Sequence, residues 1–138
     1  MKIYLDTCVY IDYFEDRSDN IRPLGELAFQ LLNRTFNCEF DIIVSDWVVS
    51  EISKQKDMLP LLLSLTTKLK KMNKLVMVSR TEKLEKEALL ISKDGVHFQD
   101  ALHIVLAAEA GAEYIVTRNL KDFPAQYDST KTVLPENI

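Results

Sequence analysis

Two kinds of hydrophobic pattern alternate along the chain. Short, almost continuously apolar runs rich in strand-forming residues occur at Lys2–Asp6, Asp41–Ser45, Leu75–Ser79, Glu113–Thr117 and Thr130–Leu134. Apolar residues at helical spacing lie between them and predict helices over Pro23–Asn37, Asp46–Gln55, Leu59–Met72, Thr81–Lys93 and Phe98–Ala110. Apolar strands separated by helices indicate an α/β fold, with a parallel sheet covered by helices on both faces.

Residues that start and stop helices support these boundaries. Ser45 is a good N-cap for the helix that begins at Asp46, and Ser79 with Glu82 has the spacing of a capping box. Gly111 is suited to end the helix that begins at Phe98. No linker, repeat or low-complexity tract interrupts the pattern, so we expect a single domain over residues 1–138.

The composition excludes several classes of protein. With 47% hydrophobic and 28% charged residues, the 138-residue chain is neither disordered nor collagen-like. Its apolar runs fall short of the ~20 residues of a membrane span, and Asp6 and Asp12 interrupt the N-terminal stretch, which is therefore not a signal peptide. Two cysteines are too few for a disulfide framework, so we expect a cytoplasmic protein with reduced thiols.

Charge is unevenly distributed around a net of −4. An acidic protein is at first sight a poor match for a nucleic-acid partner. Residues 54–87, however, carry nine Lys and Arg against four Asp and Glu, a net of +5. This basic segment is either a solvated helix face or a surface for phosphates.

Candidate chemistry lies at the carboxyl ends of the predicted strands, where ligands bind in open parallel sheets. Asp6 ends the first strand; it is either a functional carboxylate or the N-cap of a following helix. The loop after the fourth strand offers a hydroxyl, an amide and a carboxylate from Thr117, Asn119 and Asp122, unless it is only a polar turn.

Two further acids lie on helices. Glu51 flanks an apolar stripe with Val48 and Ile52, although a plain surface position is an alternative. Asp100 opens a helix that is apolar nearly all round and therefore predicted to be buried. A carboxylate at the start of such a helix needs a partner, and a divalent cation is a natural one.

The four acids together make a stronger prediction than any one of them. Crowded carboxylates repel, and a hard cation stabilises them. Oxygen ligands without a Cys/His set favour Mg²⁺ or Mn²⁺ over zinc. Because Mg²⁺ also takes phosphate oxygens as ligands, this cluster predicts phosphoryl chemistry with metal-activated water.

The whole chain resembles a PIN-domain ribonuclease, and most of all the VapC-like toxins of toxin–antitoxin pairs. The resemblance is carried by KIYLDT at the start, by Ser50-Glu51, and by the stretch FQDALHIVLAAEAGAEYIVTRNLKDF. Its most specific part is Asp100-Ala101, an alanine-rich helix, a glycine, a strand and then Thr117-Arg118-Asn119.

This resemblance implies an Mg²⁺- or Mn²⁺-dependent endonuclease that cuts RNA, a homodimer, and a cognate antitoxin that silences it. It implies a five-stranded parallel sheet in the order 3-2-1-4-5. Asp6, Glu51 and Asp100 match the family's acids, with Asp6 and Asp100 as metal ligands, and Thr7 and Thr117 match supporting polar residues.

The sequence departs from the family pattern at one position. Many members carry Asp directly after Thr-Arg, where this chain has Asn119, whose amide adds no charge. Asp122 is the candidate for the fourth carboxylate. The preferred interpretation is a single metal ion bound by Asp6 and Asp100, with Glu51 holding or deprotonating the water.

Other residues and functions stay open. Arg118 is either a phosphate clamp or a surface residue, whereas His97, His103 and Cys8 are better explained by packing or a polar rim. The alternative function is a catalytically silent PIN-like module that binds protein or RNA, which Asn119 supports. A haloacid-dehalogenase-like phosphatase is disfavoured because Cys8 occupies the place of its second Asp, and a receiver domain lacks its acidic pair and lysine.

Overall fold

A mostly parallel six-stranded sheet forms the centre of the molecule, in the order β3-β2-β1-β4-β6-β5. The computed structural model describes residues 1–16 and 23–138. Its strands are β1 (Lys2–Leu5), β2 (Asp41–Ser45), β3 (Leu75–Val78), β4 (Tyr114–Val116), β5 (Gln126–Tyr127) and β6 (Thr130–Val133). All neighbouring pairs are parallel except the pair of β5 and β6. The carboxyl ends of every strand but β5 therefore lie at one edge of the sheet.

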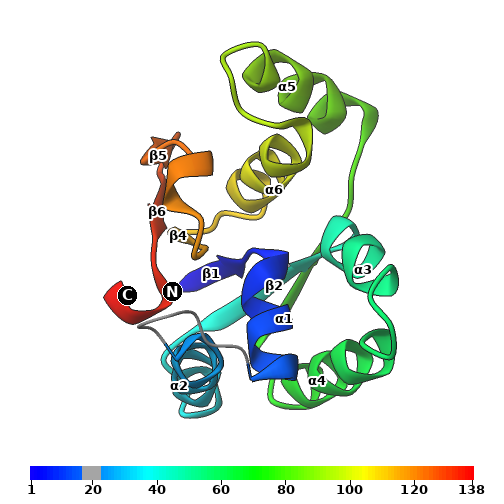
Figure 1. Cartoon of the computed structure of the whole chain (residues 1–138), viewed down its shortest axis with the longest axis vertical. Coiled ribbons are helices and arrows are strands. Elements are labelled where there is room, and N and C mark those ends of the chain that lie inside the picture. Colours follow the sequence, from blue (N-terminus) through cyan, green and yellow to red (C-terminus); the bar gives the residue numbers. More distant parts are fainter. Residues whose placement is uncertain (17–22) are drawn as a thin grey trace.

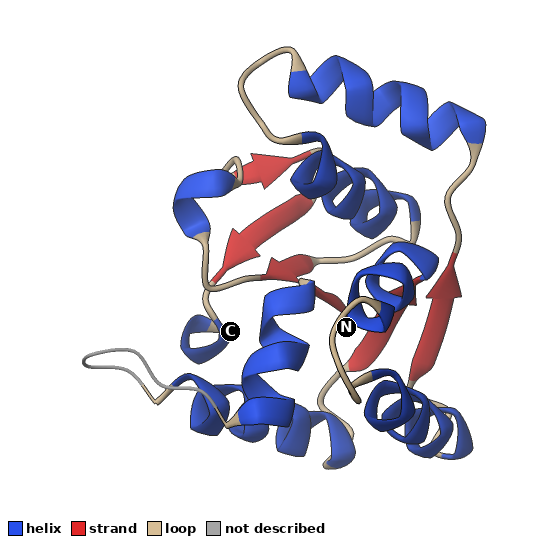
Figure 2. Ribbon diagram, turned by 45° about the vertical axis from the view of Figure 1, so that its right-hand side comes forward, coloured by secondary structure: helices blue, strands red, loops and turns tan. Residues whose placement is uncertain are grey.

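Helices cover both faces of this sheet (Figures 1 and 2). They are α1 (Thr7–Glu15), α2 (Leu24–Phe36), α3 (Asp46–Ser53), α4 (Leu59–Lys71), α5 (Glu82–Ser92) and α6 (Phe98–Glu109), with short 3₁₀ turns at Leu120–Asp122 and Pro135–Asn137. Helices α1, α2 and α4 lie on one side of the sheet, and α5 and α6 pack together on the other.

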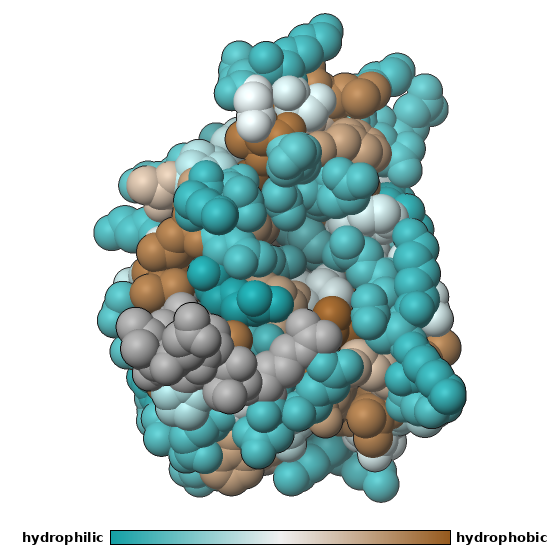
Figure 3. Space-filling model, in the orientation of Figure 1, coloured by the Kyte–Doolittle hydropathy of each residue, from teal (hydrophilic) through white to brown (hydrophobic). Residues whose placement is uncertain are grey.

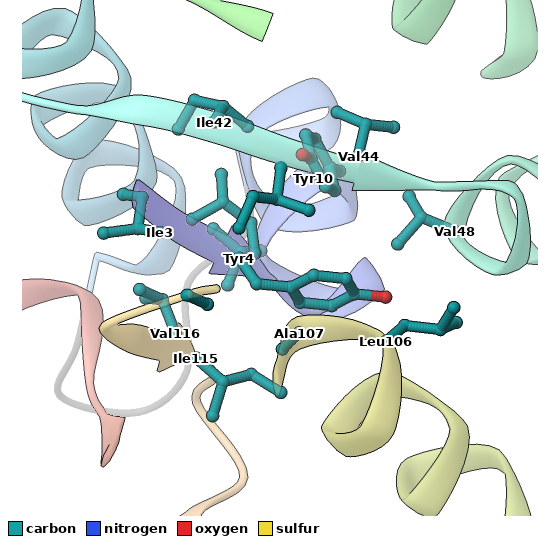
Figure 4. Packing of buried hydrophobic residues seen from close by; sticks show 14 of the residues in the cluster. Ile3, Tyr4, Tyr10, Ile42, Val44, Val48, Leu106, Ala107, Ile115 and Val116 are labelled. Carbon is teal, nitrogen blue, oxygen red and sulfur yellow. The ribbon is translucent and has the colours of Figure 1, made fainter. Parts of the chain in front are cut away.

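The central strand β1 is buried on both faces. Ile3, Tyr4 and Leu5 have no exposed surface, and Tyr4 lies in register with Ile43 of β2 and Ile115 of β4. Figure 4 shows the ring of Tyr4 extending from β1 toward helix α6, where Leu106 and Ala107 pack beside it. Burial of this strand fixes the place at which Asp6 leaves the sheet.

The predicted fold is confirmed, with two additions. The five predicted strands are present in the predicted order, and the short antiparallel strand β5 is an extra strand at the sheet edge. Helix α1 was anticipated only as one of the two interpretations of Asp6 and not by its hydrophobic pattern. Its residues include many with low helix propensity, and burial of Val9, Tyr10 and Ile11 outweighs that propensity.

The predicted helix ends were partly right. Ser45 caps α3 by accepting a hydrogen bond from the Val48 N–H, and Gly111, with φ of 77°, follows the end of α6. The predicted Ser79–Glu82 capping box is wrong: Thr81 caps α5, because its hydroxyl accepts from the Leu84 N–H. This cap satisfies an amide that the first turn of α5 leaves without a helical partner.

The surface is mostly hydrophilic with scattered apolar areas. Figure 3 shows hydrophobic surface over α5, which carries the exposed Leu89 and Leu90, and over α4, which carries the exposed Leu61 and Leu63. Among the described helices, none is long and apolar enough to cross a bilayer.

Candidate active site

Asp6 follows β1 at the carboxyl edge of the sheet, and its side chain is buried there. The residue occupies the N-cap position of α1, but its side chain makes no capping hydrogen bond. Instead, Oδ2 of Asp6 accepts from the Thr117 hydroxyl at 2.8 Å and from the Cys8 thiol at 3.2 Å. Asp6 thus takes the N-cap position without the capping hydrogen bond, and its carboxylate contacts Thr117 and Cys8 instead.

A pocket of about 290 Å³ opens beside Asp6. It is lined by side chains from four parts of the chain: Asp6, Thr7, Cys8, Ile11, Glu51, Lys54, Gln55, Asp100, His103 and Asn119. We call it the acid pocket. The fold thus brings together five of the predicted site residues from the start, middle and end of the sequence.

Asp100 and Asp6 crowd each other in this pocket. Burial, followed by the negative charge of Asp6, raises the pKa of Asp100 to about 6, and the charge of Asp122 acts in the same direction. Two carboxylates that destabilise each other's charge make an arrangement that a bound cation would relieve.

Glu51 is fixed through one of its two oxygens. Oε1 accepts from the Thr7 hydroxyl at 2.7 Å and contacts Nε2 of His103 at 2.6 Å. Partial burial acts to raise the pKa of Glu51, but the hydrogen bond and charge of His103 outweigh it, so the pKa is lowered. Glu51 is therefore held ionised against the floor of the pocket.

His103 lines the bottom of the acid pocket, and the buried Tyr4 contacts it from the core. The ring is fully buried; Nδ1 lies 2.7 Å from the Tyr4 hydroxyl, and Nε2 lies 3.4 Å from Oδ1 of Asp6. Burial acts to lower the pKa of His103, but the hydrogen bond to Glu51 and the charges of Asp6 and Glu51 raise it. The predicted packing role is therefore incomplete, since His103 contacts two of the candidate site acids.

Trp47 connects the two helices that carry Glu51 and Asp100. Its indole N–H donates to the Gln99 carbonyl at 3.2 Å, which ties α3 to the first turn of α6. Two cations lie over its ring: the Lys54 ammonium at 5.6 Å and the Arg80 guanidinium at 5.0 Å from the ring centre. Arg80 also pairs with Asp46 at 3.1 Å, whereas Lys54 itself lines the acid pocket.

The number and kind of donors in the acid pocket bear on which ion it could bind. Within residues 1–16 and 23–138, no group of three His, Cys, Asp or Glu side chains is arranged to hold a metal ion. Zinc sites use three or four such ligands, whereas Mg²⁺ is bound by one or two carboxylates together with waters and substrate phosphates. The carboxylate oxygens of Asp6 and Asp100, which line one pocket, are donors of the kind that Mg²⁺ or Mn²⁺ takes.

The sequence matches one protein family over most of its length. Residues 3–127 match the PIN domain. This chain belongs to the PIN domain family. No curated protein sequence matches it significantly.

Several solved structures share this fold. VapBC2 from Rickettsia felis, bound to a DNA fragment from their promoter, has a TM-score of 0.61 at 17% identity, with 96% of this chain and 98% of that chain covered. A toxin–antitoxin complex from Klebsiella pneumoniae has a TM-score of 0.61 at 18% identity, covering 99% of both chains. VapC20 from Mycobacterium tuberculosis, a sarcin-ricin loop cleaving toxin, has a TM-score of 0.57 at 12% identity, covering 90% and 91%.

The remaining predicted residues of this PIN domain lie around the acid pocket and do not line it. Thr117 supports Asp6 from beneath and accepts a hydrogen bond from the Asn119 backbone N–H at 3.1 Å. Asp122 is half-buried in the 3₁₀ turn at Leu120–Asp122, where its charge reaches Asp100. Arg118 pairs with the buried Asp12 of α1 at 3.0 Å.

Sequence reasoning underrated the polar residues that support the acids. His103 follows Asp100 by three residues, a spacing that places both on one helix face and is the signal that pointed to it. Tyr4 carried no such signal, because a tyrosine in an apolar strand looks like a core residue. Of the basic segment, Lys54 lines the acid pocket of the PIN domain and Lys68 lies elsewhere.

A second hollow, of about 470 Å³, lies between α1, α2 and α4. It is lined mainly by apolar side chains: Tyr13, Phe14, Phe36, Leu61, Ser64, Leu65 and Lys68. We call it the apolar groove. The residues that line the apolar groove include no Asp or Glu, so the groove lacks the carboxylates of the acid pocket.

Proposed function

We propose that this PIN domain is an Mg²⁺- or Mn²⁺-dependent endoribonuclease and the toxin of a toxin–antitoxin pair. The observation that carries the proposal is the meeting of Asp6 and Asp100 in one pocket, where burial and mutual repulsion raise the pKa of Asp100 to about 6. Such a pair is suited to hold a divalent cation against a phosphodiester.

Three acids of the pocket and two threonines that hold them have roles in this proposal. Asp6 and Asp100 hold the cation, which when bound supplies a Lewis acid that activates water and neutralises charge on the phosphate. Glu51, kept ionised by His103, orients the attacking water and accepts its proton. Thr7 and Thr117 keep Glu51 and Asp6 in place through hydrogen bonds of 2.7 and 2.8 Å.

The loop after β4 contributes from the rim. The Asn119 amide lines the pocket and can orient water or phosphate without adding charge. Asp122 adds negative charge near Asp100 as the fourth acid. Arg118 acts on the same loop through its ion pair with Asp12, which ties the loop to α1.

An RNA substrate is supported by a cation at the mouth of the pocket. Lys54 lines the pocket with no described carboxylate in ion-pair contact, so its charge is available to a phosphate. Arg80, across the Trp47 ring, is paired with Asp46 and does not line the pocket, so the charge available to a phosphate is that of Lys54. Similarity in fold to VapC20, a sarcin-ricin loop cleaving toxin, supports RNA as the substrate class.

The structural neighbours support an antitoxin as a partner. The Rickettsia felis and Klebsiella pneumoniae structures contain toxin–antitoxin complexes, which supports an antitoxin as the partner of this chain. We further propose a cytoplasmic homodimer in which each chain is a single PIN domain.

RNA cleavage in defined metal conditions tests the enzymatic proposal. The purified protein is expected to cleave single-stranded or structured RNA with Mg²⁺ or Mn²⁺, and to lose this activity with EDTA. Asp6→Asn is expected to abolish cleavage while the far-ultraviolet circular dichroism stays unchanged. Metal-independent cleavage, or full activity of Asp6→Asn, would contradict the proposal; absence of cleavage in every condition would favour the silent module instead.

Growth measurements test the toxin assignment. Induced expression is expected to arrest growth, and co-expression of the product of the adjacent gene is expected to restore it. Arrest that persists in the Asp6→Asn variant would separate toxicity from RNA cleavage and reject this part of the proposal.

A further inference from the structure

A chain of buried hydrogen bonds runs beneath the acid pocket from β2 to α3. The Ser45 hydroxyl lies 2.7 Å from the Tyr4 hydroxyl, which lies 2.7 Å from Nδ1 of His103; Nε2 of His103 then lies 2.6 Å from Oε1 of Glu51. Ser45, Tyr4 and His103 are each at most 1% exposed. Packing therefore leaves these side chains little freedom to reorient.

The polarity of the last bond follows from its partners. Both Glu51 and Asp6 present carboxylate oxygens to Nε2 of His103, at 2.6 and 3.4 Å, and carboxylates accept but do not donate. Nε2 therefore carries a proton and donates it to Oε1 of Glu51. Thr7 donates to the same oxygen. Among the described residues, none donates to Oε2 of Glu51, which leaves this atom for a ligand.

The ring of His103 is held from two sides. Tyr4 packs edge-on against it with ring centres 5.6 Å apart, and Trp47 lies at 6.4 Å in a tilted arrangement. Figure 4 shows the Tyr4 hydroxyl directed away from β1 and past Leu106 of α6, so the contact reaches His103 from inside the core. Defined polar partners at both ring nitrogens, together with these two ring contacts, hold the imidazole in one orientation.

We propose that His103 is a positioning residue for Glu51: fixed by Tyr4, it holds Oε1 and so presents Oε2 to the space that Asp6 and Asp100 also border. The inference rests on the proposed nuclease function and adds a second layer to it. Partners of this kind orient the groups that react without touching the substrate, and their removal costs about 10- to 100-fold in activity.

Two amide variants separate the two ends of the imidazole. His103→Gln places a donor near the position of Nε2, so it keeps the bond to Glu51 and loses the one to Tyr4. His103→Asn places its amide near Nδ1 and does the opposite. Both lose the same ring contacts, so a purely structural role predicts equal effects.

The expected result is a difference in kcat. His103→Asn is expected to lower kcat for RNA cleavage by about 10- to 100-fold with little change in KM, whereas His103→Gln keeps most of the wild-type kcat. Equal kcat values for the two variants, at equal thermal stability, would overturn the inference.

Two buried tyrosines give a second comparison, useful if the histidine variants fold poorly. Tyr4→Phe removes the hydroxyl that fixes His103 and is expected to lower kcat. Tyr10→Phe is the matched control, because Tyr10 is also fully buried and its hydroxyl has no hydrogen-bond partner among the described residues. Identical kcat values in these two variants would count against the role of Tyr4.

A measurement on the metal-free protein keeps this inference separate from the proposed function. In ¹⁵N-labelled protein, the Nε2 proton of His103 is expected to be protected from exchange and to shift strongly in Glu51→Gln, while Tyr10→Phe leaves it unchanged. An inactive wild-type protein would reject the nuclease proposal, yet this signal would still report whether His103 holds Glu51. If the Nε2 proton exchanged rapidly and its chemical shift stayed the same in Glu51→Gln, the inference would be overturned whether or not RNA is cut.

Discussion

The acid pocket and the apolar groove are both lined by residues of α1, but the pocket is lined mainly by charged and polar side chains and the groove mainly by apolar ones. The first turn of α1 gives Thr7 and Cys8 to the pocket, and its last turn gives Tyr13 and Phe14 to the groove. In the pocket, hydrogen bonds hold carboxylates together against their repulsion. In the groove, apolar side chains are partly buried against the core. We infer that the pocket provides activity at some cost in stability, and that the groove residues provide stability.

The largest effect is expected in the acid pocket. Asp100→Asn is expected to reduce RNA cleavage by about a thousandfold, because a metal ligand supplies several kcal/mol to the transition state. Since the mutual repulsion raises the pKa of Asp100, removing the charge is expected to leave the melting temperature of the metal-free protein unchanged or higher. Cleavage rates and thermal unfolding measure the two effects, with the exposed Asp94→Asn as control. If Asp100→Asn lowered the melting temperature and left RNA cleavage unchanged, then Asp100 would serve stability and not activity.

The next effect belongs to the groove. Leu65 is 7% exposed, so Leu65→Ala is expected to lower the free energy of unfolding by about 2–4 kcal/mol. Leu63→Ala on the same helix is the control, because Leu63 is 51% exposed and its truncation should cost less than about 0.5 kcal/mol. Urea unfolding measures both, and cleavage below the unfolding transition is expected to stay at the wild-type level. Lost cleavage in folded Leu65→Ala would show that the two hollows are coupled through α1.

A smaller effect is expected from the support of Asp6. Thr117→Val keeps the shape of the side chain and removes the 2.8 Å hydrogen bond to Oδ2, so metal-dependent cleavage is expected to fall about tenfold. Thr35→Val is the matched control, since Thr35 is also buried and its hydroxyl donates to the Leu31 carbonyl, away from the acid pocket. Titration of cleavage against Mg²⁺ distinguishes the variants; identical curves would mean that Asp6 needs no support from Thr117.

The smallest effect lies at the rim of the groove. The Lys68 ammonium lies 3.8 Å from the centre of the Phe36 ring. Lys68→Met keeps the apolar stem and removes the charge, so the free energy of unfolding is expected to fall by at most about 1 kcal/mol. Lys70→Met on the same helix is the control. If Lys68→Met also reduced RNA cleavage, then the groove would take part in substrate binding.

The sequence predicted the parts of the fold that follow from regular patterns. The apolar strands and amphipathic helices were right to within one or two residues at most ends. The hydrophobic pattern did not predict helix α1, because this helix is buried on several sides. Val9, Tyr10 and Ile11 follow one another in it, so it shows no clear amphipathic stripe. Strand β5 was not predicted, because two residues are too few to show the alternating pattern of a strand.

For the site, position along the chain was more informative than local pattern. The carboxyl ends of parallel strands meet at one edge, so Asp6 and the loop with Asn119 could be placed near each other before any coordinates. What could not be predicted is how each acid is held. The pairing of Arg118 with Asp12, and the contact of Tyr4 with His103, depend on side-chain directions that spacing alone does not determine.

The link between Thr117 and Asn119 has a consequence for how this pocket can change. Asn119 makes that hydrogen bond with its backbone N–H, so every amino acid except proline preserves it. The side chain at position 119 lines the pocket, yet the scaffold does not depend on its identity. Position 119 is thus a place where evolution, or an engineer, can add or remove a charge by one substitution without disturbing the hydrogen bonds that hold Asp6.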